Sequence, residues 1–98
     1  MARAIVLNDK DTVATLIEAG RAHEACPLQG ARPGSVHLLA DVPFGHKVAI
    51  KDMAAGADVV KYGQVIGATT APIKTGEHVH VHNVGSKRGR GDLARKEG

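Results

Sequence analysis

The sequence is poor in the residues that usually build a large hydrophobic core. Its 98 residues include only two aromatic residues, Phe44 and Tyr62, and most of the apolar content is Ala and Val. A chain of this length forms one domain that buries about two-thirds of its unfolded surface, so we expect a thin core. We also expect a partner to cover part of the domain.

Cysteine and long apolar segments are nearly absent. The only cysteine is Cys26, which excludes an internal disulfide. No apolar run approaches the ~18 residues needed to cross a bilayer, and the first residues lack the apolar stretch of a secretory signal. We therefore expect a cytoplasmic protein without a membrane segment.

The net charge of +3 is unevenly distributed along the chain. Residues 1–84 carry eight basic and eight acidic side chains, whereas residues 85–98 carry five basic and two acidic ones. The sequence thus divides into a neutral domain, residues 1–84, and a Gly/Arg-rich tail that we expect to be flexible or to bind a partner. Its guanidinium groups suit an anionic substrate or an acidic surface. The tail has no interleaved aromatic residue for base stacking, so we expect no nucleic-acid partner.

Short strand-like runs separated by turns dominate the chain. They lie at residues 2–7, 36–39, 46–51, 59–61, 65–68 and 78–84. One short helix is predicted over residues 12–19, because Asp11 can cap it and its apolar residues have helical spacing. Residues 21–34 hold too many Pro and Gly residues for a long element and are predicted to be mostly loop. The pattern predicts a mainly β domain, a small sandwich or barrel, with one helix near the N-terminus.

The densest chemical signal is the run His78-Val79-His80-Val81-His82-Asn83. In a continuous strand, His78, His80 and His82 share one face, with alternate residues about 6.6 Å apart and the outer pair about 13 Å apart. One metal ion can bridge two neighbours but not all three, which favours His80 and His82 as the functional pair. Imidazole can bind a metal, act as an acid or base, or hold an acidic substrate. A solvated strand face is the structural alternative.

Other polar residues carry weaker signals. His46 follows a turn at Gly45 and stands beside Lys47, which places both near the mouth of a site. Lys61 and Tyr62 precede Gly63, where a tyrosine more often packs with its hydroxyl in water than acts in catalysis. The remaining histidines and the thiol lack a supporting context and are predicted to be structural.

Four linked motifs resemble one known family. They are VPFGHKVA at residues 42–49, VKYGQVIG at 60–67, GEHVHVHNV at 76–84 and RGRGD at 88–92. Together they resemble the SAF domain of altronate and galactarate dehydratases, and also the small subunit of sulfolactate sulfo-lyase. The resemblance implies a β-clip fold, and the large catalytic region of the family has no counterpart in this sequence.

The resemblance implies the small subunit of a two-subunit lyase that removes water from a sugar acid, at a site shared with a large catalytic subunit. The cofactor would be a divalent metal, commonly iron(II). His46, His80 and His82 become candidate catalytic residues, with His80 and His82 also as metal ligands. Lys61, Asn83 and Arg88 become candidate substrate-binding residues.

Two other functions remain open at this point. The first is the small subunit of a sulfo-lyase acting on (2R)-sulfolactate, and the second is a stand-alone SAF module that binds carbohydrate or acts like a chaperone. A small acidic substrate is expected in either enzyme, the chain is expected to be inactive alone, and self-association is left open.

Overall fold

The computed structural model describes residues 2–85, and all of the regular structure in that range is β-strand. The strands are β1 (Arg3–Val6), β2 (Val13–Glu18), β3 (Ala25–Gly30), β4 (Gly34–His37), β5 (Lys47–Ala49), β6 (Asp58–Lys61), β7 (Gln64–Thr69), β8 (His78–Val79) and β9 (Val84–Gly85). No helix able to cross a bilayer is found in this range. The predicted mainly β class is confirmed.

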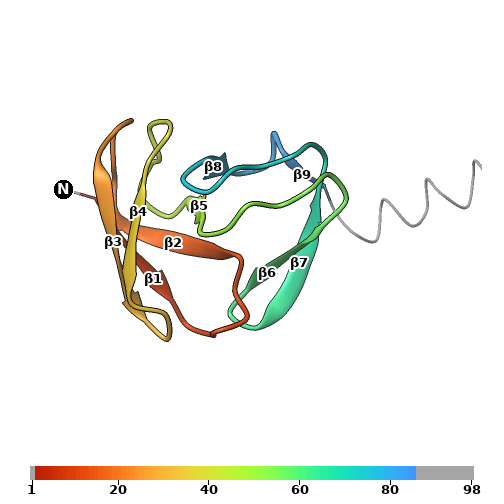
Figure 1. Cartoon of the computed structure of the whole chain (residues 1–98), viewed down its shortest axis with the longest axis horizontal. Coiled ribbons are helices and arrows are strands. Elements are labelled where there is room, and N and C mark those ends of the chain that lie inside the picture. Colours follow the sequence, from red (N-terminus) through yellow and green to blue (C-terminus); the bar gives the residue numbers. More distant parts are fainter. Residues whose placement is uncertain (1, 86–98) are drawn as a thin grey trace, which may run out of the picture.

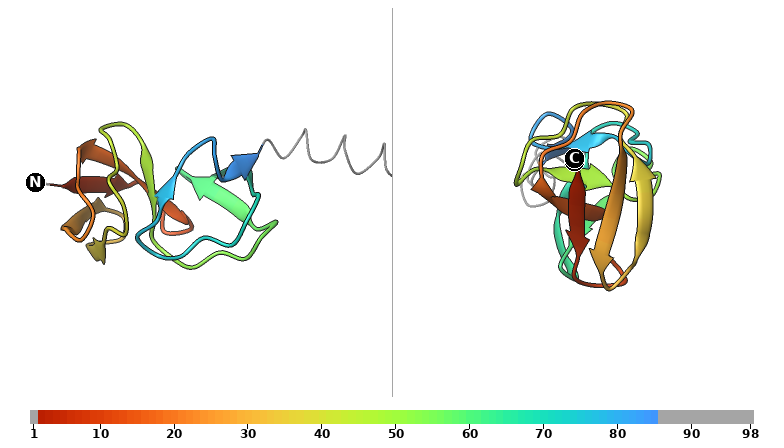
Figure 2. Two further views of the ribbon diagram at one scale, coloured as in Figure 1. Left: turned by 90° about the horizontal axis from the view of Figure 1, so that it is seen from above. Right: turned by 90° about the vertical axis from the view of Figure 1, so that its left-hand side faces the viewer.

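The strands form two sheets joined end to end. A six-stranded sheet has the order β4-β3-β1-β2-β5-β8, and a three-stranded sheet has the order β6-β7-β9. Neighbouring strands are antiparallel except β1 and β3, which run parallel. Figures 1 and 2 show β1, β3 and β4 at one end of the molecule and β6, β7 and β9 at the other, with β5 and β8 between them.

The predicted helix over residues 12–19 is wrong, because this segment forms β2. β2 pairs antiparallel with β1 on one side and β5 on the other. Its β-branched residues Val13, Thr15 and Ile17 favour a strand, and the pairing outweighs the helical spacing of the apolar positions. That spacing arises because Leu16 packs into one buried cluster while Val13 packs into another.

The predicted loop over residues 21–34 is also wrong in part, because it contains β3 and the start of β4. These strands pair antiparallel, with Cys26 opposite Val36. Pro27 is tolerated because the pairing of β3 with β1 starts only at Leu28, so no hydrogen bond to β1 is lost. Pro and Gly therefore mark the ends of short strands here, and not one long loop.

The core is divided between the two sheets. One cluster, built mainly from Ala and Val with Leu16 and Leu38, lies within the six-stranded sheet. The second includes Val13, Met53 and Ile73 and lies where the sheets meet. Small side chains thus bury two modest clusters, in line with the thin core expected from composition.

A buried carboxylate helps to join the sheets. Asp11 is 1% exposed and accepts hydrogen bonds from the backbone N–H of Gly63 (2.7 Å) and of Asn8 (3.3 Å). Gly63 and Tyr62 form the two-residue turn between β6 and β7, and both have positive φ, as the favoured hairpin turns require. This contact fixes the hairpin, and with it Lys61, against the start of β2.

Candidate functional site

His46 lies on a tight turn directly before β5. Its N–H donates to the carbonyl of Pro43, and its own carbonyl accepts from the N–H of Leu16 in β2. The next residue, Lys47, pairs with Thr15 of β2 and with Val79 of β8. His46 is therefore held at the seam where β5 joins both neighbours.

β8 is much shorter than the strand expected over residues 78–84. The chain turns after Val79, and the N–H groups of Asn83 and Val84 both donate to the carbonyl of His80. The side-chain amide of Asn83 is buried in this turn: its Oδ1 accepts from the N–H of His80 (3.0 Å) and its Nδ2 donates to the carbonyl of His78 (2.9 Å). Residues 78–83 are thus a short strand followed by a turn closed by one side chain.

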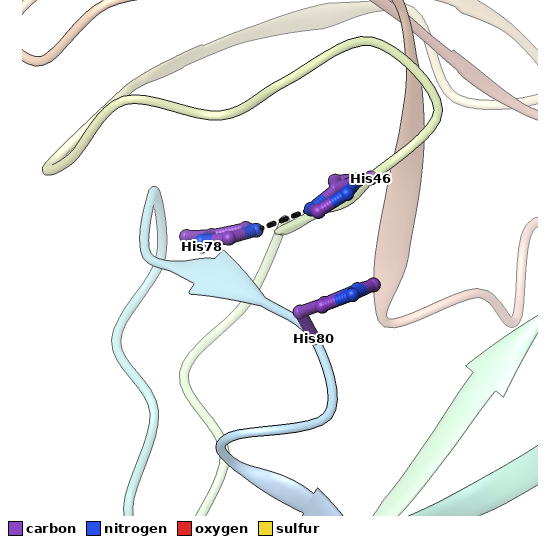
Figure 3. Close-up of side chains that lie close together, drawn as sticks. All are labelled: His46, His78 and His80. Atoms are coloured by element: carbon purple, nitrogen blue, oxygen red, sulfur yellow. Dashed lines mark hydrogen bonds between the residues drawn. The ribbon is translucent and has the colours of Figure 1, made fainter.

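The turn brings the imidazoles closer together than a strand would. The ring centroids of His78 and His82 are 5.2 Å apart, so the 13 Å separation expected for a continuous strand is wrong. His46 stacks on His80 with centroids 3.9 Å apart, and its Nδ1 lies 2.9 Å from Nε2 of His78 in a hydrogen bond. Figure 3 shows this histidine cluster, formed by His46, His78 and His80.

Hydrogen bonding within the histidine cluster couples the protonation of its rings. In the contact between His46 and His78, one nitrogen must donate and the other accept, so the two tautomers depend on each other. Nδ1 of His80 is buried and has no hydrogen-bond partner within residues 2–85. A buried polar atom without a partner is uncommon and indicates a missing ligand or partner.

Two rings of the cluster have a pKa below the usual histidine value. For His78, burial has the largest effect in lowering the pKa, followed by the neighbouring His46, His82, His80 and Lys47. For His80, burial is again first, followed by His46, Lys47 and His82. Both rings therefore favour the neutral form, which is the form that binds metal ions.

The histidine cluster fits a divalent metal ion after a small adjustment. One ring nitrogen from each of His46, His78 and His80 lies within 4.8 Å of the other two. Nitrogens that bind one ion at about 2.1 Å in a tetrahedral site lie about 3.4 Å apart, so the rings must rotate toward one another by roughly 1 Å to hold the ion. The unpaired Nδ1 of His80 and the neutral state of two rings support this fit.

A hollow of about 300 Å³ opens beside the cluster. It is lined by Lys47, Ile66, His80, Val81, Val84 and Gly85. Among these described residues most of the wall is aliphatic, and Lys47 carries the one ammonium group. Burial, and next the nearby Lys61, lowers the pKa of Lys47. The hollow thus combines one cation and one imidazole with an apolar wall.

The structure places only some of the predicted site residues together. His46 and His80 belong to the histidine cluster, and the exposed His82 lies beside it. Lys61 is half-buried at the end of β6, with Nζ 4.8 Å from the centre of the Tyr62 ring. The side-chain amide of Asn83 forms hydrogen bonds with backbone groups of the turn. Arg88 and the predicted tail beyond residue 85 lie outside the described residues.

Sequence reasoning gave little weight to two residues of the site. The strand spacing leaves His78 outside the functional pair, and the sequence places Lys47 near the mouth of a site without assigning it a role. The pairing of Lys47 with Val79 shows why both matter, because it places the start of β5 against β8. The strand-like pattern of residues 46–51 pointed to β5 but not to its neighbour.

The fold and the site together define a small all-β domain that presents a cluster of three histidine side chains beside the pairing of β5 with β8. Residues 2–87 match the family described as the altronate/galactarate dehydratase SAF domain. The match covers most of the sequence, so the chain belongs to this family. The resemblance drawn from the four motifs is confirmed.

Curated relatives fall into two groups. The (2R)-sulfolactate sulfo-lyase subunit alpha of Chromohalobacter salexigens is 40% identical over 72 residues, which cover 74% of this chain and 77% of that protein. The subunit of the same name from Paracoccus pantotrophus is 49% identical over 49 residues, covering 50% of this chain and 73% of that protein. The altronate dehydratase of Escherichia coli is 53% identical over 49 residues, covering 50% of this chain but only 10% of that protein.

Proposed function

We propose that this chain is the small subunit of a two-subunit lyase of the altronate/galactarate dehydratase type. It would supply the histidine cluster to a site that a large subunit completes. The observation that carries this proposal is the convergence of His46, His78 and His80, with an unpartnered buried nitrogen, in a domain whose relatives are lyases.

Elimination beside a carboxylate needs a base for the α-proton, help for the leaving group and cations that hold the acid. The three clustered imidazoles would hold a divalent metal ion, iron(II) by family resemblance. When bound, that ion would assist the leaving group as a Lewis acid. His82 remains outside the three ligands and is exposed, so it suits proton exchange with the substrate. Lys61 would contribute positive charge.

We infer a large partner subunit because this domain corresponds to only a small part of the dehydratases. The segment shared with the altronate dehydratase makes up a tenth of that protein. Two relatives of similar length are named as alpha subunits. A large partner that carries the remaining catalytic groups would explain both facts, and the chain alone would then be inactive.

A second candidate reaction is the elimination of sulfite from (2R)-sulfolactate. The two relatives that this chain covers over 77% and 73% of their lengths carry the sulfo-lyase name, whereas the dehydratases are far longer. This match in length favours the sulfo-lyase. In both reactions the leaving group departs from the carbon adjacent to the one that carries the carboxylate. The same cluster would therefore serve either reaction.

Reconstitution tests the proposal. The chain is co-expressed with a candidate large subunit of the dehydratase type, and the purified pair is assayed with sugar acids and sulfolactate in the presence of iron(II). We expect turnover from the pair and none from the chain alone. Failure of the native chain to capture any such partner would favour a stand-alone SAF binding module.

A further inference from the structure

Two lysines from different sheets flank the contact between Thr15 and Tyr62, and one of them, Lys47, lies beside His80 of the histidine cluster. Lys47 in β5 lies directly opposite Thr15 of β2, and cross-strand partners share a face of the sheet. The hydroxyl of Tyr62 donates to Oγ1 of Thr15 at 3.4 Å, and Nζ of Lys61 lies 4.8 Å from the centre of the Tyr62 ring. The contact between Thr15 and Tyr62 thus lies between the two lysine side chains.

Within residues 2–85, neither Lys47 nor Lys61 takes part in an ion pair with a carboxylate. Lys47 is half-buried and lines the hollow beside His80. After burial, the positive charge of Lys61 contributes to lowering the pKa of Lys47, and a nearby anion relieves such repulsion, particularly where water is partly excluded. The arrangement therefore suits an anionic ligand.

We propose that Lys47 and Lys61 form a binding site for the second anionic group of a small dianionic acid. This proposal rests on the proposed function, in which the first acid group lies at the histidine cluster. The group bound by the lysines is a carboxylate or a sulfonate, since both offer several oxygens to ammonium donors. An acid with one anionic group would leave one of the two positions unused.

The residues that line the hollow indicate the chemistry of the ligand segment between its two acid groups. The side chains of Ile66 and Val84 offer no hydrogen-bond partners, so a hydroxyl placed against them would lose its contacts with water without compensation. The carbon atoms between the two acid groups would lie on this wall. The site therefore selects for a short acid with few hydroxyls in that segment.

Binding of matched acids to the full, metal-free chain tests the site. Backbone amide shifts are followed by NMR during titration with succinate or butyrate, which have the same number of carbons, at equal ionic strength. Succinate is expected to bind at least about fivefold more tightly than butyrate, because it can engage a second ammonium group. The largest shifts are expected at Lys47, Lys61 and Ile66.

Substitutions assign the preference to the two lysines. Lys47→Met and Lys61→Met each keep the aliphatic chain and are expected to reduce the preference for succinate to less than about twofold. Lys61→Arg should retain it, and Lys51→Met, at an exposed position, is the matched control. Equal affinities of the native chain for both acids, or a preference that survives both lysine substitutions, would overturn the site without needing any variant to be active.

The outcome is separable from that of the proposed function. Selective succinate binding by a chain that never forms an active pair would leave the anion site standing and remove the lyase assignment. An active pair whose small subunit shows no preference for succinate would do the opposite.

Discussion

Replacing Asn83 with alanine removes the side chain that closes the histidine turn. The substitution deletes two hydrogen bonds, one to the N–H of His80 and one to the carbonyl of His78, at a residue that is 5% exposed. A buried hydrogen bond contributes about 1 kcal/mol, and a partner left unpaired costs about 1–3 kcal/mol. Because water can reach part of the vacated turn, we expect a loss of about 2 kcal/mol. For a domain of this size, that lowers the melting temperature by roughly 8–16 °C.

Urea denaturation of the native and variant chains measures this loss, and NMR of the imidazole protons reports whether His78 and His80 keep their places. Asn83→Asp is the companion variant: it retains an acceptor for the N–H of His80 but turns a carboxylate oxygen toward the carbonyl of His78, so at neutral pH it should be destabilised as well. A change below about 0.5 kcal/mol in Asn83→Ala, with unchanged imidazole signals, would refute the positioning role. A raised KM in the reconstituted pair with unchanged stability would instead support the predicted substrate contact.

Three further predictions follow from the same geometry. The affinity of the chain for cobalt(II), measured by the visible absorption of the bound ion, should fall at least about tenfold in His46→Ala and much less in His82→Ala. Equal losses in the two variants would contradict the three-ligand set. Gly76→Ala should lower the urea midpoint strongly, because Gly76 has φ +92° and an added Cβ would collide with the carbonyl of His37; an unchanged midpoint would contradict this. In the metal-free chain, the pKa of His78 is lowered by folding, so the unfolded state binds a proton more readily. The contribution of neutral His78 to the free energy of unfolding is therefore complete above about pH 6.5 and is lost as pH falls through the lower pKa of the folded state. Urea midpoints measured from pH 7.5 to pH 5 should fall less steeply in His78→Gln than in the native chain.

The sequence predicted the strands that alternate cleanly and the turns with strong residue signals. The strand-like runs at residues 59–61 and 65–68 predicted most of β6 and β7, and the run at residues 46–51 predicted β5. β2 was assigned to a helix because its apolar residues serve two clusters, which produces helical spacing in a strand. A periodic pattern reports which residues are buried, and it does not report how many cores bury them.

The sequence pointed to the histidines that cluster in the structure, but it did not predict how they are arranged. Alternation of His and Val predicted one long strand, whereas the Asn83 side chain turns the backbone after Val79. A side chain that competes for backbone hydrogen bonds is a known reason for a strand or helix to end early. The partnership of His46 with His78 depends on the pairing of β5 with β8, which joins residues that are 32 positions apart. Such long-range pairing cannot be deduced from local pattern.

Turnover by the reconstituted pair, with substitutions in the histidine cluster, tests the central claim most directly. His46→Ala and His80→Ala should each assemble with the large subunit yet lower kcat at least about 100-fold, as expected when a metal ligand or a proton-transfer group is lost. His37→Ala, at an exposed histidine outside the cluster, should retain full activity. Full turnover by assembled complexes that carry either cluster substitution would contradict the shared site.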